Sequence, residues 1–257
     1  MKLNFLGTGT SYGVPYIACD CDVCRSNDLC NKRLRSSILV EEGDTRVLVD
    51  STPDLREQFL RAGITTLSGV LWTHSHNDHI IGLDDLRPIT DKCGYIDGYA
   101  NEETMTRLKV VFDYVFVEGR NHGGFPRVRG HVLEPRQTVK VENLRVTAIP
   151  IMHYKREIFA YRIESDTRTL VYATDCSYIP DTSWDLMRDA DLLVLGALRY
   201  KEHPAHFSVA QALHAVEKLK PRRALFTHIA HDLEHRTINA ELPPGVEVAY
   251  DTQTIEV

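Results

Sequence analysis

The chain has 257 residues, of which 43% are hydrophobic and 26% are charged, as in an ordinary globular protein. Its formal net charge of −6 argues against a protein that binds nucleic acid through bulk positive charge, and no run of about 18 apolar residues is available to cross a membrane. No secretion signal is visible, so we expect a cytoplasmic protein that forms one domain over residues 1–257, with its cysteines reduced.

Short apolar runs between turn residues predict two groups of strands with helices between them. In chain order, we expect strands at 2–6, 36–41, 46–50, 69–73, 145–150, 158–164, 169–173, 191–196 and 223–227. A helix is predicted from Pro53 to Ala62, with Gly63 at its end, and a second from Ser208 to Leu219 with Ser208 as its cap. Two sheets covered by helices fit this order, as do other α/β folds.

The run from His74 to His79 places three imidazoles and one carboxylate within six residues, directly after an apolar segment. Imidazole and carboxylate ligands suit zinc, manganese or iron. A solvated loop rich in histidine is the alternative. The position of the run at the end of a predicted buried strand favours the metal site.

Three more candidate ligands follow the ends of other apolar runs. His153, Asp175 and His228 each stand where a predicted strand emerges into a loop, and functional groups in sheet proteins gather at such ends. Each residue alone is ordinary. Together with the first cluster they indicate one shared site.

These residues resemble the metallo-β-lactamase superfamily. His74, His76, Asp78 and His79 match its HxHxDH signature, and His153, Asp175 and His228 match its later motifs in order and approximate spacing. The resemblance implies an α/β fold, the αββα sandwich. It also implies that two catalytic metals are held, one by His74, His76 and His153, the other by Asp78, His79 and His228, with Asp175 shared.

Within that superfamily the chain looks most like the PhnP-type phosphodiesterases, which carry an extra zinc near the N-terminus. The matching residues here are Cys19, Cys21 and Cys24, in a loop near 19–24, together with His231. Three thiolates and one imidazole form the closed set of a structural zinc site. Redox-active thiols are the alternative, Cys30 is a substitute ligand, and Cys93 and Cys176 are expected to bind no metal.

The resemblance implies a metal-dependent phosphodiesterase that hydrolyses small, cyclic phosphodiesters such as cyclic ribose phosphates or cyclic nucleotides. Two cations, zinc or manganese, activate water and neutralise phosphate charge. Asp78 binds metal and orients the nucleophile. His206 resembles the histidine that acts in this branch as general acid or phosphate binder, with His203 as its rival. We expect a homodimer without stable nucleic-acid or membrane partners.

Two relatives of this branch give alternative functions, a tRNA 3′-processing endonuclease and a PqqB-like biosynthetic protein. The first alternative rests on basic residues between Tyr99 and Arg136, namely Arg107, Lys109, Arg120, Arg127, Arg129 and Arg136. No long basic arm is visible to clamp tRNA, and the complete ligand set argues for catalysis. β-Lactam hydrolysis fits Asp78 and the His206 region less well.

Other residues carry weaker predictions. Asp50 ends a strand and resembles the superfamily's aspartate that orients metal-binding loops. The segment from Gly7 to Thr10 is expected to form a tight turn after the first strand, with phosphate binding as the alternative. Arg33 and Arg35 are expected on a solvated face or against substrate. The segment 154–156, Tyr-Lys-Arg, lies closer to the expected metals and is the first basic segment to test.

Overall fold

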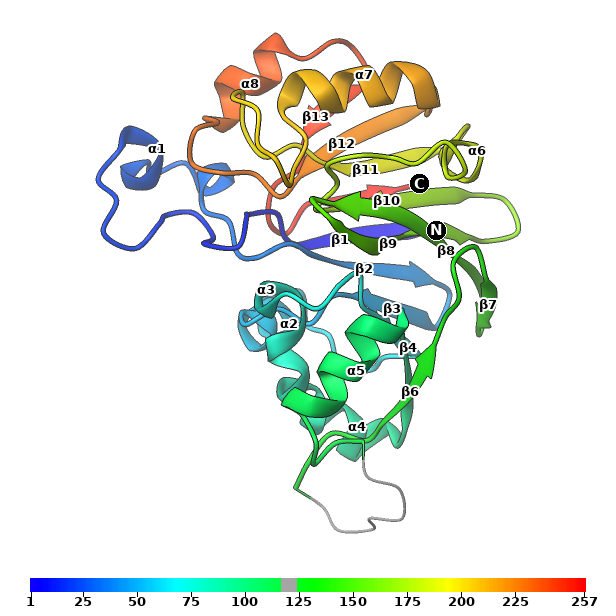
Figure 1. Cartoon of the computed structure of the whole chain (residues 1–257). Coiled ribbons are helices and arrows are strands. Elements are labelled where there is room, and N and C mark those ends of the chain that lie inside the picture. The colour runs from blue at the N-terminus through cyan, green and yellow to red at the C-terminus, as the bar shows by residue number, and fades with distance from the viewer. Residues whose placement is uncertain (117–123) are drawn as a thin grey trace.

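The computed structural model describes residues 1–116 and 124–257 as two stacked sheets with helices on both outer faces (Figure 1). Arg120, one of the basic residues considered above, lies outside the described residues. The layers follow the order helix, sheet, sheet, helix, which is the predicted αββα architecture.

The first sheet has seven strands and is built from the N-terminal half of the chain plus one C-terminal strand. Its order is β14 (Thr254–Glu256), β1 (Lys2–Gly7), β2 (Ser37–Glu42), β3 (Thr45–Val49), β4 (Gly69–Leu71), β5 (Ile96–Ala100) and β6 (Val128–Val132). β1 to β3 pair antiparallel, and β3 to β6 pair parallel, so the carboxyl ends of β3, β4 and β5 share one edge.

The second sheet also has seven strands and pairs parallel at one side and antiparallel at the other. Its order is β13 (Val246–Val248), β12 (Arg223–Thr227), β11 (Leu192–Gly196), β10 (Thr169–Ala173), β9 (Arg156–Glu164), β8 (Leu144–His153) and β7 (Thr138–Val141). The parallel strands β10, β11 and β12 again end at one common edge.

Eight α-helices and two 3₁₀ segments are assigned in the described part of the chain. The α-helices are α1 (Asp22–Arg25), α2 (Leu55–Ala62), α3 (Asn77–Ile80), α4 (Arg87–Cys93), α5 (Glu102–Val111), α6 (Trp184–Met187), α7 (Val209–Leu219) and α8 (His235–Glu241). The 3₁₀ segments are Leu29–Asn31 and Ile81–Leu86. None of the described helices has the length and apolar character that a membrane crossing needs.

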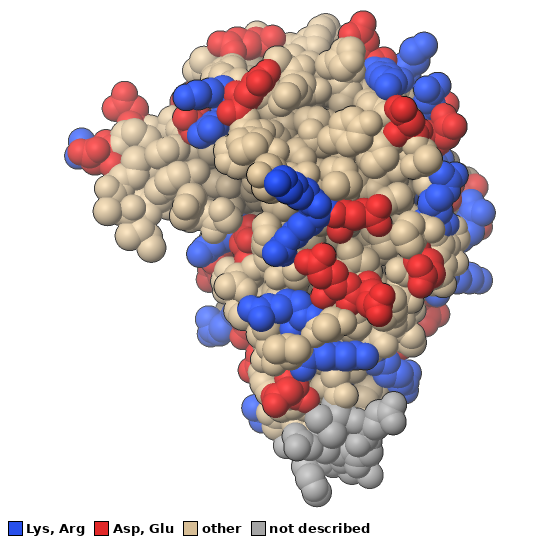
Figure 2. Space-filling view, viewed as in Figure 1, with Lys and Arg blue, Asp and Glu red and all other residues tan. Residues whose placement is uncertain are grey.

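The apolar core has three parts, one between the sheets and one under each helical layer. Along β10, Leu170 and Tyr172 pack between the sheets, whereas Val171 and Ala173 pack on the helical side. This alternation is the two-residue period of a strand buried on both faces. Figure 2 shows that the segment carrying α1 stands out from this packed body.

Most predicted elements are confirmed, with shifted ends. The helix predicted from Pro53 begins at Leu55, because Asp54 occupies its N-cap position and Pro53 lies in the preceding turn. β8 continues past the predicted end at 150 to His153, although it contains Pro150. Its pairing with β7 ends at Thr147, so the proline lies where β8 has a partner on one side only.

A buried ion network ties the start of the chain to its end. The Asp251 carboxylate accepts hydrogen bonds from the Thr8 amide at 2.9 Å, the Thr8 hydroxyl at 2.8 Å and the Leu34 amide at 2.8 Å. Arg33 donates to the same hydroxyl at 2.7 Å and to the Ala249 carbonyl at 2.6 Å. Burial raises the pKa of Asp251 to about 6, so the carboxylate is still ionised at pH 7.

We predict that Asp251→Ala lowers the free energy of unfolding by about 3 kcal/mol, because it leaves two amides and the Thr8 hydroxyl without their acceptor and removes a negative charge near the buried Arg33 guanidinium. Urea unfolding followed by circular dichroism measures the change. Asp20→Ala is the control: Asp20 is exposed, 3.5 Å from Arg25, and its loss leaves the midpoint unchanged. Equal midpoints for the two variants would contradict the assigned role of Asp251.

Candidate metal centre

The predicted metal ligands gather where strands of the two sheets end. The segment His74–His79 follows β4, His153 ends β8, Asp175 follows β10 and His228 follows β12. Parallel strands of one sheet deliver their carboxyl ends to the same edge, and a crevice at that edge is the usual ligand site of such sheets. The stacked sheets therefore bring residues 154 positions apart in sequence, 74 to 228, within reach of one another.

The first group consists of His74, His76, His153 and Asp175, whose ligand atoms all lie within 4.8 Å of one another. His74 Nε2 lies 3.8 Å from Asp175 Oδ2. The ring of His153 lies 5.2 Å from that of His74 and 4.9 Å from that of His76, measured between centroids. This spacing leaves room for one cation between them, since zinc binds imidazole nitrogen at about 2.0–2.1 Å.

The second group consists of Asp78, His79, Asp175 and His228, with the same spread of at most 4.8 Å. His79 Nε2 lies 3.1 Å from Asp78 Oδ2 and 3.4 Å from Asp175 Oδ1. His228 Nε2 lies 3.4 Å from that same Asp175 oxygen. Asp175 thus belongs to both groups, and the grouping is the one that the resemblance implies. Whether each residue binds a cation stays a prediction.

Two properties of the groups fit bound cations. The Nε2 atoms of His74, His79 and His228 are buried and have no hydrogen-bond partner, although buried polar atoms are normally paired. The charge balance gives the second property. Burial disfavours a charged His79, but Asp78 and Asp175 outweigh burial and hold its pKa well above the usual value. Nearby positive charge therefore stabilises these buried carboxylates, and divalent cations supply such charge.

Asp50 holds His79 from the side away from the groups. Its Oδ2 lies 2.7 Å from His79 Nδ1, and its Oδ1 accepts the Thr73 amide at 2.8 Å. The Thr73 hydroxyl contacts Asp50 at 2.9 Å and His74 Nδ1 at 3.0 Å. A carboxylate on one ring nitrogen keeps the other free to bind metal, so Asp50 has the orienting position that its resemblance suggests.

His206 lies against both groups, whereas His203 is farther out. The His206 ring stacks on His228 with centroids 4.8 Å apart, and its Nδ1 lies 3.9 Å from Asp175 Oδ2. Burial lowers the pKa of His206 to about 3, so its imidazole is neutral and can donate one hydrogen bond. His203 Nδ1 instead accepts the Ala205 amide at 3.2 Å and braces the loop.

The same loop is fastened to the first group. His153 Nδ1 donates to the Ala205 carbonyl at 2.8 Å, one residue before His206. This bond fixes which nitrogen of His153 faces the group. This bond could not be predicted from the sequence, because a backbone carbonyl is common to every residue type.

Three residues of the centre have left-handed backbone conformations. The φ angles of Asp50, Asp175 and His228 are +66°, +52° and +60°. Such values are uncommon outside glycine, and aspartate and histidine tolerate them better than most residues. Sharp turns of this kind directly after a strand point the side chain into the crevice, and their strain is offset by the packing around them.

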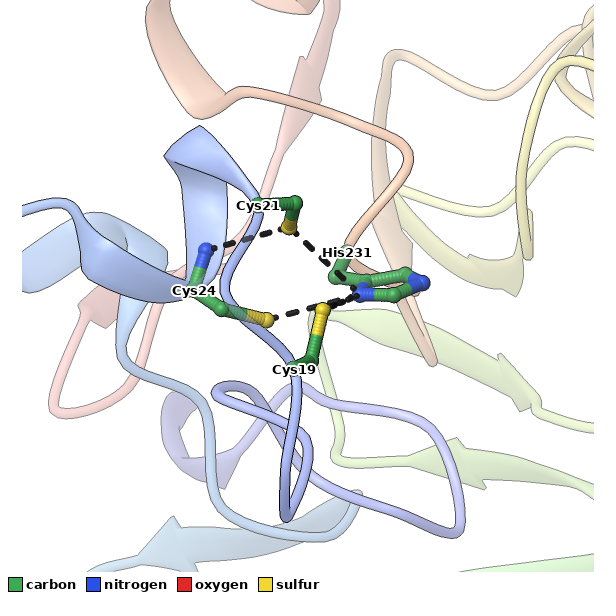
Figure 3. A group of neighbouring side chains, drawn as sticks. All are labelled: Cys19, Cys21, Cys24 and His231. Carbon is green, nitrogen blue, oxygen red and sulfur yellow. Dashed lines mark hydrogen bonds between the residues drawn. The ribbon is translucent and has the colours of Figure 1, made fainter.

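The predicted cysteine site assembles at the base of the α1 segment (Figure 3). The sulfurs of Cys19, Cys21 and Cys24 lie 3.2, 3.6 and 3.4 Å from His231 Nδ1. Tyr16 stacks on the His231 ring with centroids 3.9 Å apart, a contact the sequence analysis missed. Cys30, Cys93 and Cys176 are in none of the three ligand groups found among the described residues.

The cysteine group is linked to the candidate metal centre through the backbone of the segment from His228 to His231. His231 follows His228 by three residues, and between them Ile229 bonds both sides of the N-terminal turn: its amide donates to Thr8 and its carbonyl accepts from Thr10, at 2.9 and 3.1 Å. The turn from Gly7 to Thr10 therefore makes backbone hydrogen bonds, as expected for a tight turn after the first strand.

The prediction of a solvated face or a substrate contact is wrong for Arg33, whereas Arg35 is partly exposed. Arg33 is only 3% exposed and takes part in the network of Asp251, so it is neither solvated nor open to substrate. Arg35 makes two contacts of 2.9 and 3.1 Å to the Asp54 carboxylate and donates to the Ser11 carbonyl. Both arginines brace the N-terminal turn.

Two hollows open beside the ligand groups. The larger, about 640 Å³, is lined by Asp78, Glu103, Arg107 and Arg156 among others. The smaller, about 330 Å³, is lined by His153 and Tyr154 among others. Both fall in the range of small-molecule sites.

Known proteins share this fold and much of this sequence. A family model described as a β-lactamase superfamily domain matches residues 45–229. An octanoyltransferase from Porphyromonas gingivalis is 34% identical over 98% of the chain but only 50% of its own length, so the chain spans about half of that relative.

Solved structures confirm the predicted metallo-β-lactamase sandwich. The structure of a diphosphatase from the PhnP family has a TM-score of 0.91 and 40% identity, covering 100% of this chain and 97% of that one. Zn²⁺-bound PqqB from Methylobacterium extorquens has a TM-score of 0.79 at 18% identity, with both chains fully covered, and shares the fold.

We predict that Cys21→Ser loses one equivalent of bound metal and lowers Tm by about 5 °C or more, because an incomplete ligand set no longer ties the α1 segment to His231. Metal analysis and calorimetry measure the two effects. Cys93→Ser, which changes an exposed thiol outside the group, is the matched control. Retention of all metal by Cys21→Ser would rule out a metal-binding role for this thiol.

Asp50→Ala is predicted to weaken metal binding by about 10–100-fold, because His79 loses the carboxylate that orients it. Titration against a competing chelator measures the affinity. Asp97→Ala is the control. Asp97 lies 2.8 Å from the exposed His131, much as Asp50 lies from His79, and its removal is expected to leave the metal affinity unchanged. If the two variants bind metal equally well, Asp50 has no orienting role.

Proposed function

We propose that this chain, which belongs to the β-lactamase superfamily, is a metal-dependent hydrolase that uses two divalent cations, zinc or manganese, to hydrolyse small phosphodiesters. Cyclic ribose phosphates and cyclic nucleotides are the substrates that the resemblance suggests. A diphosphatase at 40% identity over the whole chain supports chemistry at phosphorus.

The observation that carries the proposal is the shared carboxylate. Asp175 lies within 3.8 Å of imidazole nitrogens from both groups, the nitrogens of His74, His79 and His228. A carboxylate has two oxygens and can serve two cations at once. This arrangement supports a pair of catalytic metals, with a third, structural zinc held by the cysteine group.

The bound cations would supply Lewis acidity, which makes water a nucleophile near neutral pH and neutralises charge on phosphate oxygens. The chain's own residues do the positioning. The free oxygen of Asp78 orients the attacking water, and the neutral imidazole of His206 donates a hydrogen bond to a phosphate oxygen or to the leaving oxygen. His206 is suited to this task because its loop is fastened to His153.

The proposed partner is therefore a small anionic substrate. On the face shown in Figure 2, acidic and basic side chains are interspersed, and no continuous basic surface is present on it. This supports the proposal that nucleic acid is not a stable partner. A homodimer and a cytoplasmic location remain predictions.

We predict that His76→Ala reduces hydrolysis of bis(p-nitrophenyl) phosphate by more than about 100-fold while Tm changes little, since the ring lines both hollows and is not part of the core. Release of p-nitrophenol from the metal-loaded protein measures the rate. His131→Ala is the control, because His131 is a surface imidazole paired with Asp97.

Unchanged turnover in His76→Ala would reject the proposed site. A panel of cyclic nucleotides, cyclic ribose phosphates and pre-tRNA then ranks the substrates. Cleavage of pre-tRNA with a steep dependence of affinity on salt would reject the small-substrate proposal in favour of the tRNA-processing alternative.

A further inference from the structure

Two hollows of different chemistry flank the candidate metal centre, and two side chains line both of them. The larger lies between the start of α3 and helix α5 and is lined by Ser75, Asn77, Glu103, Thr106 and Arg107. The smaller is lined by His153, Tyr154, Pro204 and Ala205. Arg156 and His76 line both. A phosphorus atom at the centre therefore has a polar, charged space on one side and a largely apolar space on the other.

Tyr154 lines the apolar hollow from a strained turn. It follows His153 in the two-residue connection of the β8–β9 hairpin and has a φ of +55°. A bulky side chain there is unfavourable, and glycine would occupy the position without cost. The turn is held by the bond from the Tyr154 amide to the Ser177 hydroxyl at 2.9 Å. Strain retained beside a cavity points to a role for the ring itself.

Arg107 and Arg156 give the larger hollow its capacity for anions. Arg156 Nη1 lies 3.3 Å from Glu103 Oε1, and both side chains are about half exposed, at 53% and 55%. Such a solvated ion pair is weak, so an arriving anion can compete for the guanidinium. Arg107 lies one helical turn beyond Glu103 on α5 and faces the same hollow. Guanidinium groups bind phosphate through two parallel hydrogen bonds.

We propose that Tyr154 and the pair Arg107 and Arg156 determine specificity for diphosphate diesters that carry a flat ring, the chemistry of a nucleoside diphosphate ester. The ring stacks on Tyr154, one phosphate occupies the metal centre and the second meets the arginines. Water adds to one phosphorus, the bridging P–O bond breaks, and two phosphate monoesters form. This inference rests on the proposed function and narrows its substrate class.

ADP-ribose, which has an adenine ring and two phosphates, tests the class in the metal-loaded protein. We expect release of AMP with a higher kcat/KM than for bis(p-nitrophenyl) phosphate. Hydrolysis of bis(p-nitrophenyl) phosphate without hydrolysis of ADP-ribose would overturn this inference while leaving the proposed function intact. Failure on both substrates would count against the proposed function itself.

Tyr154→Gly tests the stacking role. Glycine relieves the positive φ, so Tm stays equal or rises, while loss of the ring raises KM for ADP-ribose about tenfold. Tyr154→Phe keeps the ring and the wild-type KM, and adenosine inhibits both ring-bearing proteins but not Tyr154→Gly. Metal content is measured for each variant, because His153 is adjacent. Equal KM and equal inhibition in the glycine variant would overturn the role of Tyr154.

Arg107→Ala tests the second phosphate. We expect the ratio of kcat/KM for ADP-ribose to that for bis(p-nitrophenyl) phosphate to fall about tenfold, and Arg107→Lys to recover only part of it. Two matched controls leave the ratio unchanged: Lys109→Ala on the same helix, and Tyr178→Ala, an exposed tyrosine outside both hollows. A ratio unaffected by Arg107→Ala would overturn the role of the arginines.

Discussion

The rest of the structure depends on the burial of carboxylates among imidazoles at the end of the sheets. Asp50 is fully buried, Asp175 is 2% exposed, and Asp78 lies close by. An isolated buried carboxylate is costly, so the site is stable only when positive charge lies next to these oxygens. Without cations His79 must carry a proton to provide it. With cations bound, its Nε2 would instead be free to act as a ligand.

The two sheets bury these carboxylates directly, because the side chains lie at or near the ends of packed strands. Asp50 and His228 are each the first residue after a strand, Asp175 is the second and His153 is the last residue of its strand, and the strand behind each of them is packed on both faces. Asp50, Asp175 and His228 take left-handed conformations that would be unfavourable in a mobile loop. Rigid strands and hydrogen bonds around them, such as the Thr73 contacts to Asp50, hold these conformations in place.

Most strands, and the residues that meet in the candidate metal centre, could be predicted because both leave local signals, whereas the choice of the αββα sandwich came from the resemblance. Strands buried on two faces read as continuous apolar runs, and ligands follow such runs directly. α5 and the exposed edge strand β6 were missed, since neither has a strongly periodic pattern. The β6 residues are mostly exposed, so apolar alternation is weak there.

Long-range contacts could not be predicted in the same way. Nothing in the sequence distinguishes Arg33 from a surface arginine. Its buried position depends on contacts with Thr8 and Ala249, which are distant in sequence. The hydrogen bond from His153 to the Ala205 carbonyl likewise depends on how the chain folds and not on the residue type at position 205. The neutral state of His206 follows from burial, which a single sequence does not give.

The wide spacing of the ligands has a consequence for how the protein matures during synthesis. The cysteine group closes only when Cys19 meets His231, and the catalytic groups need His74 and His228 together. Nearly the whole chain must therefore leave the ribosome before either site is complete. Loading of the proposed metals would then be a late event in maturation, and for most of translation the N-terminal thiols would lack the fourth proposed ligand, His231.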